Sequence, residues 1–188
     1  NDLNRLKSFS NKLNLSKSIE LIDTILEKIR TESFSLAIVG EFNRGKSKLI
    51  NALLGQEILP SDVLPTTATL NRVIFGMTPS VKVVFKDGSQ KEVPIKELKQ
   101  YVTKLTVESE KKASSIQEVI LQYNVEYCRN NVQIFDTPGL NEHGDMDELT
   151  ISILPYVDAA ILVMSAQAPF AKSEQNFLET HLLSSDSV

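Results

Sequence analysis

The spacing of hydrophobic positions changes along this chain, and each spacing predicts a different element. In residues 3–30 the apolar side chains recur every three or four positions, and Lys, Asp, Glu and Asn fill the other face. That spacing predicts one or two amphipathic helices with a break near residues 14–16. Such a segment either packs on its own domain, as amphipathic helices usually do, or forms part of a helical bundle completed by other parts of the chain.

After residue 32, short apolar runs alternate with helical patterns. The runs predict strands at residues 34–39, 70–75, 116–126, 132–136 and 158–165, and a hairpin over 81–93 that turns at Asp87-Gly88. Helices are predicted at 46–54, 95–105 and 173–183, with Gly55 as a stop and Ser173 as a cap. This alternation predicts an α/β fold with a mainly parallel, doubly wound sheet flanked by helices. We expect a helical segment at 1–32 and an α/β domain at 33–188.

Composition and charge narrow the functional classes. The chain has 188 residues, with 20 Lys+Arg against 24 Asp+Glu and a net charge of −4, which argues against general nucleic-acid binding. Cys128 is the single cysteine, so no internal disulfide can form, which fits a reducing compartment. The apolar runs are too short to cross a bilayer, and no signal peptide opens the chain. We therefore expect a cytoplasmic location, and we interpret both ends as fragment boundaries.

The sequence GEFNRGKS at residues 40–47 matches the phosphate-binding pattern G-x-x-x-x-G-K-S, between a predicted strand and a predicted helix. Gly40 and Gly45 allow the loop to wrap around phosphates, so that backbone N–H groups point inward. Lys46 is expected to reach the β- and γ-phosphates as a catalytic group, and the Ser47 hydroxyl to ligate Mg²⁺. The alternative is a chance glycine-rich turn. The other residues expected to bind nucleotide in this stretch are Asn43, Arg44 and Lys48.

Arg44 has two possible roles within this loop. It either donates charge to phosphate as a catalytic group, in its own site or across a dimer, or it points to solvent.

A second motif, Asp136-Thr137-Pro138-Gly139, follows the strand predicted at 132–136. A carboxylate at that strand end suits the Mg²⁺ shell, and the N–H of Gly139 can approach a γ-phosphate. Taken alone, the tetrapeptide is also a good turn sequence. The separation 136 − 47 = 89 is long for a minimal GTPase, and we assign the extra length to an insertion at about residues 76–130.

Three threonines in the loop at residues 59–69 supply the hydroxyl that a nucleotide switch requires. Thr66 and Thr67 are both candidates to bind nucleotide, and such a group ligates Mg²⁺ only while the γ-phosphate is present. A solvated polar loop explains the threonines equally well.

Taken together, residues 40–47, 49–55, 59–61, 65–68 and 136–140 resemble the bacterial dynamin-like proteins, and mitofusins are similar over the same stretch. The resemblance covers about residues 34 to 183. It implies an enlarged Ras-like GTPase domain that hydrolyses GTP to GDP with Mg²⁺, and it places the catalytic switch threonine at Thr67. It also implies self-association through the GTPase domain, membrane remodelling through parts absent from this sequence, and a location peripheral to the membrane. Residues 1–32 resemble the bundle piece that precedes such domains.

The chain departs from this family pattern at several positions. Phe42 and Asn43 stand where eukaryotic dynamins carry Gln and Ser, so a Gln-based self-activation is not transferred. Lys48 replaces the usual Ser or Thr, and Leu140 stands where Ras has its water-orienting Gln. The base-reading motif N/T-K-x-D is absent, and we expect it on a strand after Val188. Two rival functions are a P-loop ATPase or kinase, and a nucleotide-dependent scaffold without turnover.

Overall fold

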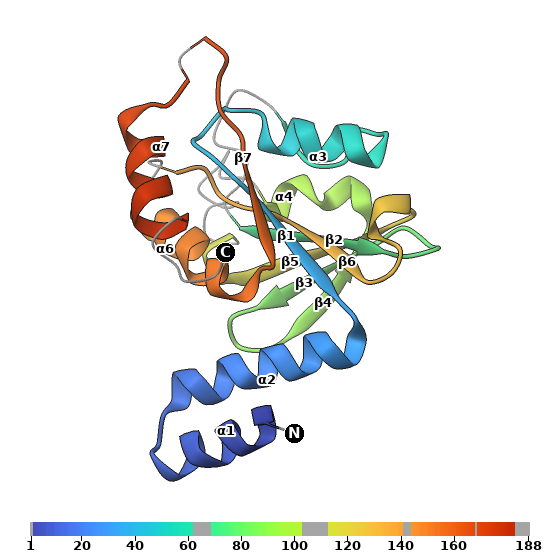
Figure 1. Cartoon of the computed structure of the whole chain (residues 1–188). Helices are drawn as coiled ribbons and strands as arrows, with labels where there is room; N and C mark the ends of the chain where they lie inside the picture. Colours follow the sequence, from blue (N-terminus) through green and yellow to red (C-terminus); the bar gives the residue numbers. More distant parts are fainter. Residues whose placement is uncertain (1, 62–68, 103–112, 141–143, 168, 183–188) are drawn as a thin grey trace.

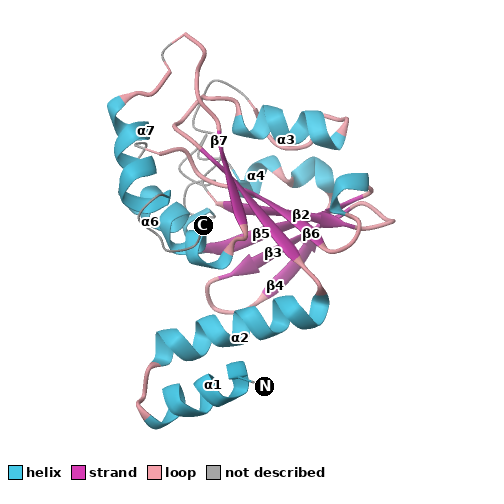
Figure 2. Ribbon diagram, in the orientation of Figure 1, coloured by secondary structure: helices cyan, strands magenta, loops and turns pink. Residues whose placement is uncertain are grey.

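The computed structural model describes residues 2–61, 69–102, 113–140, 144–167 and 169–182. Within these residues, seven strands form one sheet in the order β4-β3-β5-β2-β6-β1-β7. The strands are β1 (Phe34–Val39), β2 (Leu70–Phe75), β3 (Ser80–Phe85), β4 (Gln90–Val93), β5 (Ile116–Tyr123), β6 (Val132–Asp136) and β7 (Ala159–Leu162). The α-helices are α1 (Asp2–Lys12), α2 (Ser16–Thr31), α3 (Lys46–Leu54), α4 (Lys99–Val102), α6 (Gly144–Ile153) and α7 (Lys172–Phe177). Figure 2 shows the strands between α6 and α7 on one side and α3 and α4 on the other.

Strand directions divide the sheet into a parallel centre and an antiparallel extension. β1 pairs in parallel with β6 and β7, and β2 pairs in parallel with β5. β2 is antiparallel to β6, and β3 is antiparallel to both β5 and β4, so the sheet as a whole is mixed. Because β1, β6 and β7 are parallel, their carboxyl ends share one edge of the sheet, where ligands bind in folds of this class. The extension consists of β3, β4 and β5, which lie beyond β2 in the sheet. All three strands fall within residues 76–130, the range in which we predicted an insertion.

The alternation of side chains along β1 fills two cores, one on each face of the sheet. Ile38 packs with residues of α3, α4 and the extension, such as Ile50 and Val102. Ala37 and Val39 face the other way and pack with Leu140 and Phe177. Figure 1 shows α3 and α4 grouped apart from α6 and α7 accordingly. The central strand is therefore held from both sides, and so is the loop that follows it.

Most predicted elements are confirmed, and a few differ. The helix expected at 95–105 begins as a 3₁₀ turn at Ile95–Glu97 and continues as α4, and its end lies outside the described residues. The strand expected at 116–126 ends at Tyr123 and is followed by a 3₁₀ turn at Glu126–Cys128. The strand expected at 158–165 is shorter and only half-buried, because β7 pairs with β1 alone and lies at the edge of the sheet.

Ser173 does not cap α7, contrary to our prediction. The helix begins at Lys172 with Ala171 at its N-cap position, so Ser173 lies inside the first turn. The Ser173 hydroxyl instead donates to the Glu41 carboxylate. The helical path continues beyond α7 as a π-helix at Leu178–Leu182.

The first two helices form a hairpin that is joined to the sheet at the end of α2. The helical path is interrupted between α1 and α2 at Asn14, where φ is 53°, as the sequence predicted. Lys28 Nζ donates to Asp158 Oδ1 at 2.9 Å, and Asn131 Nδ2 donates to the Thr31 carbonyl at 2.6 Å. Large apolar side chains of the hairpin nevertheless remain exposed, including Leu6, Phe9, Leu13 and Ile29. The contacts with the sheet agree with local packing, and the exposed apolar side chains agree with a bundle completed by other parts of the chain.

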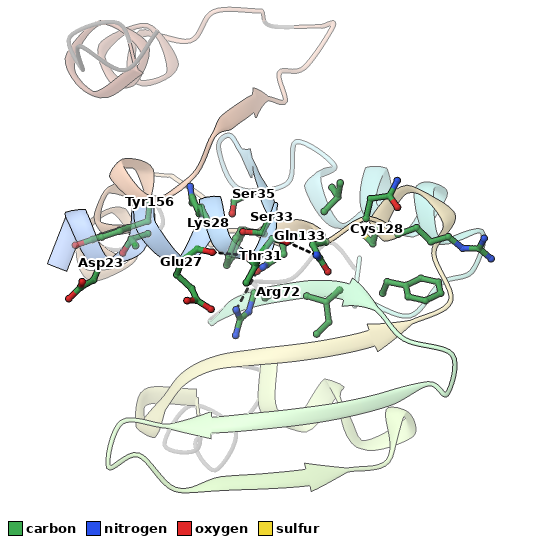
Figure 3. Close-up of a pocket in the computed structure, with 18 residues that line it drawn as sticks. Asp23, Glu27, Lys28, Thr31, Ser33, Ser35, Arg72, Cys128, Gln133 and Tyr156 are labelled. Carbon is green, nitrogen blue, oxygen red and sulfur yellow. Dashed lines mark hydrogen bonds between the residues drawn. The ribbon is translucent and has the colours of Figure 1, made fainter. Parts of the chain in front are cut away.

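A cavity of about 880 Å³ lies beside this junction, between α2 and the starts of β1 and β6 (Figure 3). Arg72 lies in it and donates to Glu118 at 2.7 Å and to Gln133 at 3.3 Å. The cavity is lined by Val132, Gln133 and Phe135 of β6, and Asp136 is not among its lining residues. No helix in the described part of the chain has both the length and the apolar character needed to cross a membrane.

Cys128 provides a test of the core that lies between the sheet and the helices α3 and α4. Its side chain is fully buried, and burial raises the pKa of the thiol from 9.0 to about 11. Below pH 9 both the folded and the unfolded chain carry a neutral thiol. Between pH 9 and 11 only the unfolded chain loses this proton, so the free energy of unfolding falls with rising pH, by up to about 3 kcal/mol.

Urea unfolding at pH 8 and pH 10.5 measures this loss, and a Cys128→Ala variant is the control because it lacks the titrating group. We expect the variant to lose less stability than the unaltered protein over the same interval. An identical loss in both proteins would contradict a buried, neutral thiol.

Candidate nucleotide site

The loop after β1 has the strand–loop–helix form that the sequence predicted. β1 ends at Val39 and α3 begins at Lys46, so the unpaired N–H groups at the start of α3 face the loop. Gly40 has a φ of 149°, and a Cβ there would lie 2.4 Å from the Val163 carbonyl oxygen. Gly45 adopts a φ of 94°, which side chains other than hydrogen disfavour. The loop therefore depends on glycine at both positions.

Lys46 closes this loop from within. Its side chain is buried, and Nζ donates to the carbonyl oxygens of Gly40 and Glu41, each at 3.0 Å. The ammonium group thus lies across the start of the loop, inside the curve of the backbone. An ammonium in this position can bind the oxygens of a polyphosphate.

Ser47 and Asp136 meet in the core although 89 positions separate them. Ser47 Oγ donates to Asp136 Oδ2 at 3.0 Å, and both side chains are buried. The parallel register of β1 and β6 pairs Ile38 with Asp136, which places the carboxylate at the sheet edge beside the loop. A hydroxyl and a carboxylate side by side are hard oxygen donors of the kind that Mg²⁺ prefers, so the residues fit this ion.

Two further polar residues extend this pair toward the threonine-rich loop: Asn71, which the sequence did not single out, and Thr69, the third threonine of that loop. Asn71 is buried in β2 and donates from Nδ2 to Asp136 Oδ2 at 3.4 Å. Thr69 donates from Oγ1 to Asn71 Oδ1 at 3.1 Å. Asn71 is one of two polar residues in the predicted strand at 70–75, beside Arg72, and this was the available signal for it. Through these contacts, the end of the threonine-rich loop is tied to Asp136.

The Asp136–Gly139 motif lies against the phosphate-binding loop. Thr137 donates from Oγ1 to the Ile38 carbonyl at 2.9 Å, and Leu140 N donates to the Gly40 carbonyl at 3.1 Å. A Cβ on Gly139 would lie 2.6 Å from Phe42 Cα. The absence of a side chain at Gly139 therefore allows the two backbones to touch, in addition to the role toward γ-phosphate that the sequence suggests.

Arg44 does not point freely to solvent. Its Nη2 donates to Glu41 Oε2, and its Nε donates to Glu174 Oε1 at 3.1 Å. The Arg44 side chain is only 20% exposed, and that of Glu174 is fully buried. Glu174 comes from the first turn of α7, and no local sequence signal identified it as part of this site.

The remaining predicted site residues divide into two groups. Asn43 and Lys48 are exposed near the loop, and Asn43 has a φ of 59°. Thr66 and Thr67 lie outside the described residues. The structure thus brings together Gly40, Arg44, Gly45, Lys46, Ser47, Asp136 and Gly139, with Asn71 and Glu174 as additions.

Comparisons with known proteins agree with this geometry. The model of the dynamin family matches residues 36–188. An uncharacterised protein in the xynA 3' region of Caldicellulosiruptor sp. (strain Rt8B.4) is 32% identical over 93% of this chain and 43% of its own length. The bacterial dynamin-like protein of Nostoc punctiforme is 31% identical over 93% of this chain and 26% of its own length.

Among solved structures, that of an oligomerised bacterial dynamin pair is similar, with a TM-score of 0.65 and 23% identity. The similarity covers 89% of this chain and 26% of that one. The fold is therefore shared with a bacterial dynamin. The chain spans less than half the length of the relatives it matches.

Proposed function

This chain belongs to the dynamin family as a GTPase domain, and from that premise we propose that it binds GTP with Mg²⁺ and hydrolyses GTP to GDP and phosphate. The observation that carries the proposal is the arrangement of side chains around the loop at residues 40–47. There the Lys46 ammonium lies inside the loop, and the Ser47 hydroxyl lies 3.0 Å from the Asp136 carboxylate. Phosphoryl transfer requires positioning and charge neutralisation more than covalent chemistry, and these groups supply both.

Each residue has a proposed role in this reaction. Lys46 neutralises the β- and γ-phosphate oxygens, and the backbone of the loop from Gly40 to Gly45 surrounds them. Ser47, Thr67 and Asp136 hold Mg²⁺, which when bound offsets the negative charge that builds up between the β- and γ-phosphates. Gly139 approaches the γ-phosphate with its N–H group. The residues proposed to complete the nucleotide contacts are Asn43, Arg44, Lys48 and Thr66.

Arg44 is proposed to donate charge to phosphate, either in its own site or across a dimer. Its guanidinium group carries five N–H donors, and two of them bind Glu41 and Glu174. No contact among the described residues uses the other three. A guanidinium with donors left over can bind phosphate without leaving its carboxylate partners.

The wider activity of the protein is proposed from its family. We propose that residues 33–188 act as the GTPase domain, with residues 76–130 as its insertion, and that residues 1–32 belong to a helical bundle. Self-association through the GTPase domain and work on a membrane surface, through segments other than the one described, complete the proposal.

Phosphate release from GTP and from ATP, measured on the full-length protein with and without lipid vesicles, tests the reaction. We expect release from GTP, with ATP unable to compete at equal concentration. Preference for ATP would instead identify a P-loop ATPase. Tight nucleotide binding with no release under any condition would identify a scaffold.

A further inference from the structure

We propose that Glu174 is a positioning residue of this nucleotide site, which holds Arg44, and through it the phosphate-binding loop, against α7. The inference deepens the proposed function and rests on it. It concerns four side chains, two from the loop and two from the first turn of α7, which we call the Arg44 bracket: Glu41, Arg44, Ser173 and Glu174.

Glu174 is anchored on its own helix before it reaches the loop. Its side chain is fully buried, and each carboxylate oxygen has a different partner. Oε2 accepts from the Ala171 backbone N–H at 2.9 Å, and Oε1 accepts from Arg44 Nε at 3.1 Å. A buried carboxylate is costly unless it is paired and hydrogen-bonded, so the position of this one is set by its two donors.

The guanidinium group of Arg44 is fixed in plane by the bracket. Nε binds Glu174 on α7, and Nη2 binds Glu41 within the loop. Because a guanidinium is planar and rigid, two contacts on different nitrogens determine its orientation. The orientation of its other N–H groups is then fixed as well. The long side chain has lost its rotamer freedom before the nucleotide binds.

The bracket also reaches the part of the loop that holds Lys46. Glu41 accepts from Ser173 on α7, and the Glu41 carbonyl accepts from Lys46 Nζ. At the start of the same loop, next to Glu41, Gly40 packs against the Val163 backbone, which follows β7. The segment from β7 to α7 therefore contacts the loop at two places, and Glu174 is the buried contact that carries charge.

Glu174→Gln is the variant that isolates this role. The side chain keeps its shape, but its amide offers a single acceptor oxygen to the two donors, Ala171 N–H and Arg44 Nε–H. One donor loses its partner in either orientation of the amide, and the negative charge that pairs with Arg44 is lost in both. In the full-length protein we expect GTP turnover to fall about ten-fold while the dissociation constant of GDP changes less than two-fold.

Arg44→Ala and the double variant Arg44→Ala/Glu174→Gln decide whether Glu174 acts through Arg44. We expect Arg44→Ala to lower turnover by at least as much as Glu174→Gln, and the double variant to be no slower than Arg44→Ala. Glu179→Gln is the matched control, because Glu179 is an exposed carboxylate that accepts from Gln175, and it should leave turnover unchanged. Additive losses in the double variant, or full turnover in Arg44→Ala, would overturn the inference.

Thermal melting gives a second readout that does not depend on hydrolysis. Arg44→Ala leaves the Glu174 carboxylate buried without its cation, and the double variant removes that charge. The double variant should therefore melt at a higher temperature than Arg44→Ala, and the reverse order would contradict the bracket. If the unaltered protein released no phosphate from GTP, the proposed function would fail, and the melting order would still decide whether Glu174 holds Arg44.

Discussion

Lys46→Ala is expected to weaken the binding of GTP and GDP by about 100-fold or more. The ammonium is buried within the loop and bound to the Gly40 and Glu41 carbonyls at 3.0 Å. A charge-assisted contact to phosphate in such a site is worth about 3 kcal/mol, which corresponds to about two orders of magnitude in affinity. Titration of a fluorescent guanine nucleotide into the full-length variant measures the loss.

Lys86→Ala is the control for this experiment. Lys86 is an exposed lysine at the turn after β3, outside the nucleotide site, and its replacement removes the same charge from the protein. Both variants should show the circular dichroism of the unaltered protein. If Lys46→Ala bound guanine and adenine triphosphates as tightly as the unaltered protein does, no phosphate pocket would exist at residues 40–47.

Gly139→Ala is expected to lower GTP turnover about 100-fold and to destabilise the fold by about 2 kcal/mol. The added Cβ would lie 2.6 Å from Phe42 Cα and 2.8 Å from Phe42 N. These are backbone atoms of the phosphate-binding loop, so no side-chain rotation relieves the contact. Either the loop or the Asp136–Gly139 segment must move, and both belong to the site.

Gly88→Ala separates this effect from the general cost of replacing glycine. Gly88 lies in the turn between β3 and β4, with a φ of 83° and nothing within 4 Å of an added Cβ. The change should cost about 1 kcal/mol in backbone strain and leave turnover as it was. Equal turnover in Gly139→Ala and the unaltered protein would show that the two backbones do not touch as the structure has them.

The family assignment and the site agree because both depend on the same short stretches of chain. Residues 40–47 and 136–140 carry the resemblance to dynamins, and they are also the stretches that meet at the carboxyl edge of β1 and β6. The described residues add Asn71 and Glu174, neither of which belongs to a recognised motif. Variants of these two residues therefore test contacts that the phosphate-binding motif does not itself specify.

The amino-acid sequence by itself determined the local elements of this protein. β1, β2, β6 and α3 have the bounds that the hydrophobic spacing predicted, and Gly55 follows the last residue of α3 as the expected stop. Lys46 and Ser47 were found for the same reason, since a loop between a strand and a helix is specified by neighbouring residues. Turn chemistry, helix stops and side-chain periodicity all act within a few positions of the chain.

Only the tertiary structure decided which distant residues became neighbours. The order of the strands places β2 beside β6, and this brings Asn71 to Asp136. The path of the chain from β7 to α7 brings Glu174 to Arg44, 130 positions away, and draws Ser173 from the predicted cap to Glu41. Such pairings depend on burial, charge and strand register in three dimensions, and a buried carboxylate in a helix gives no local sign of the arginine that it will meet.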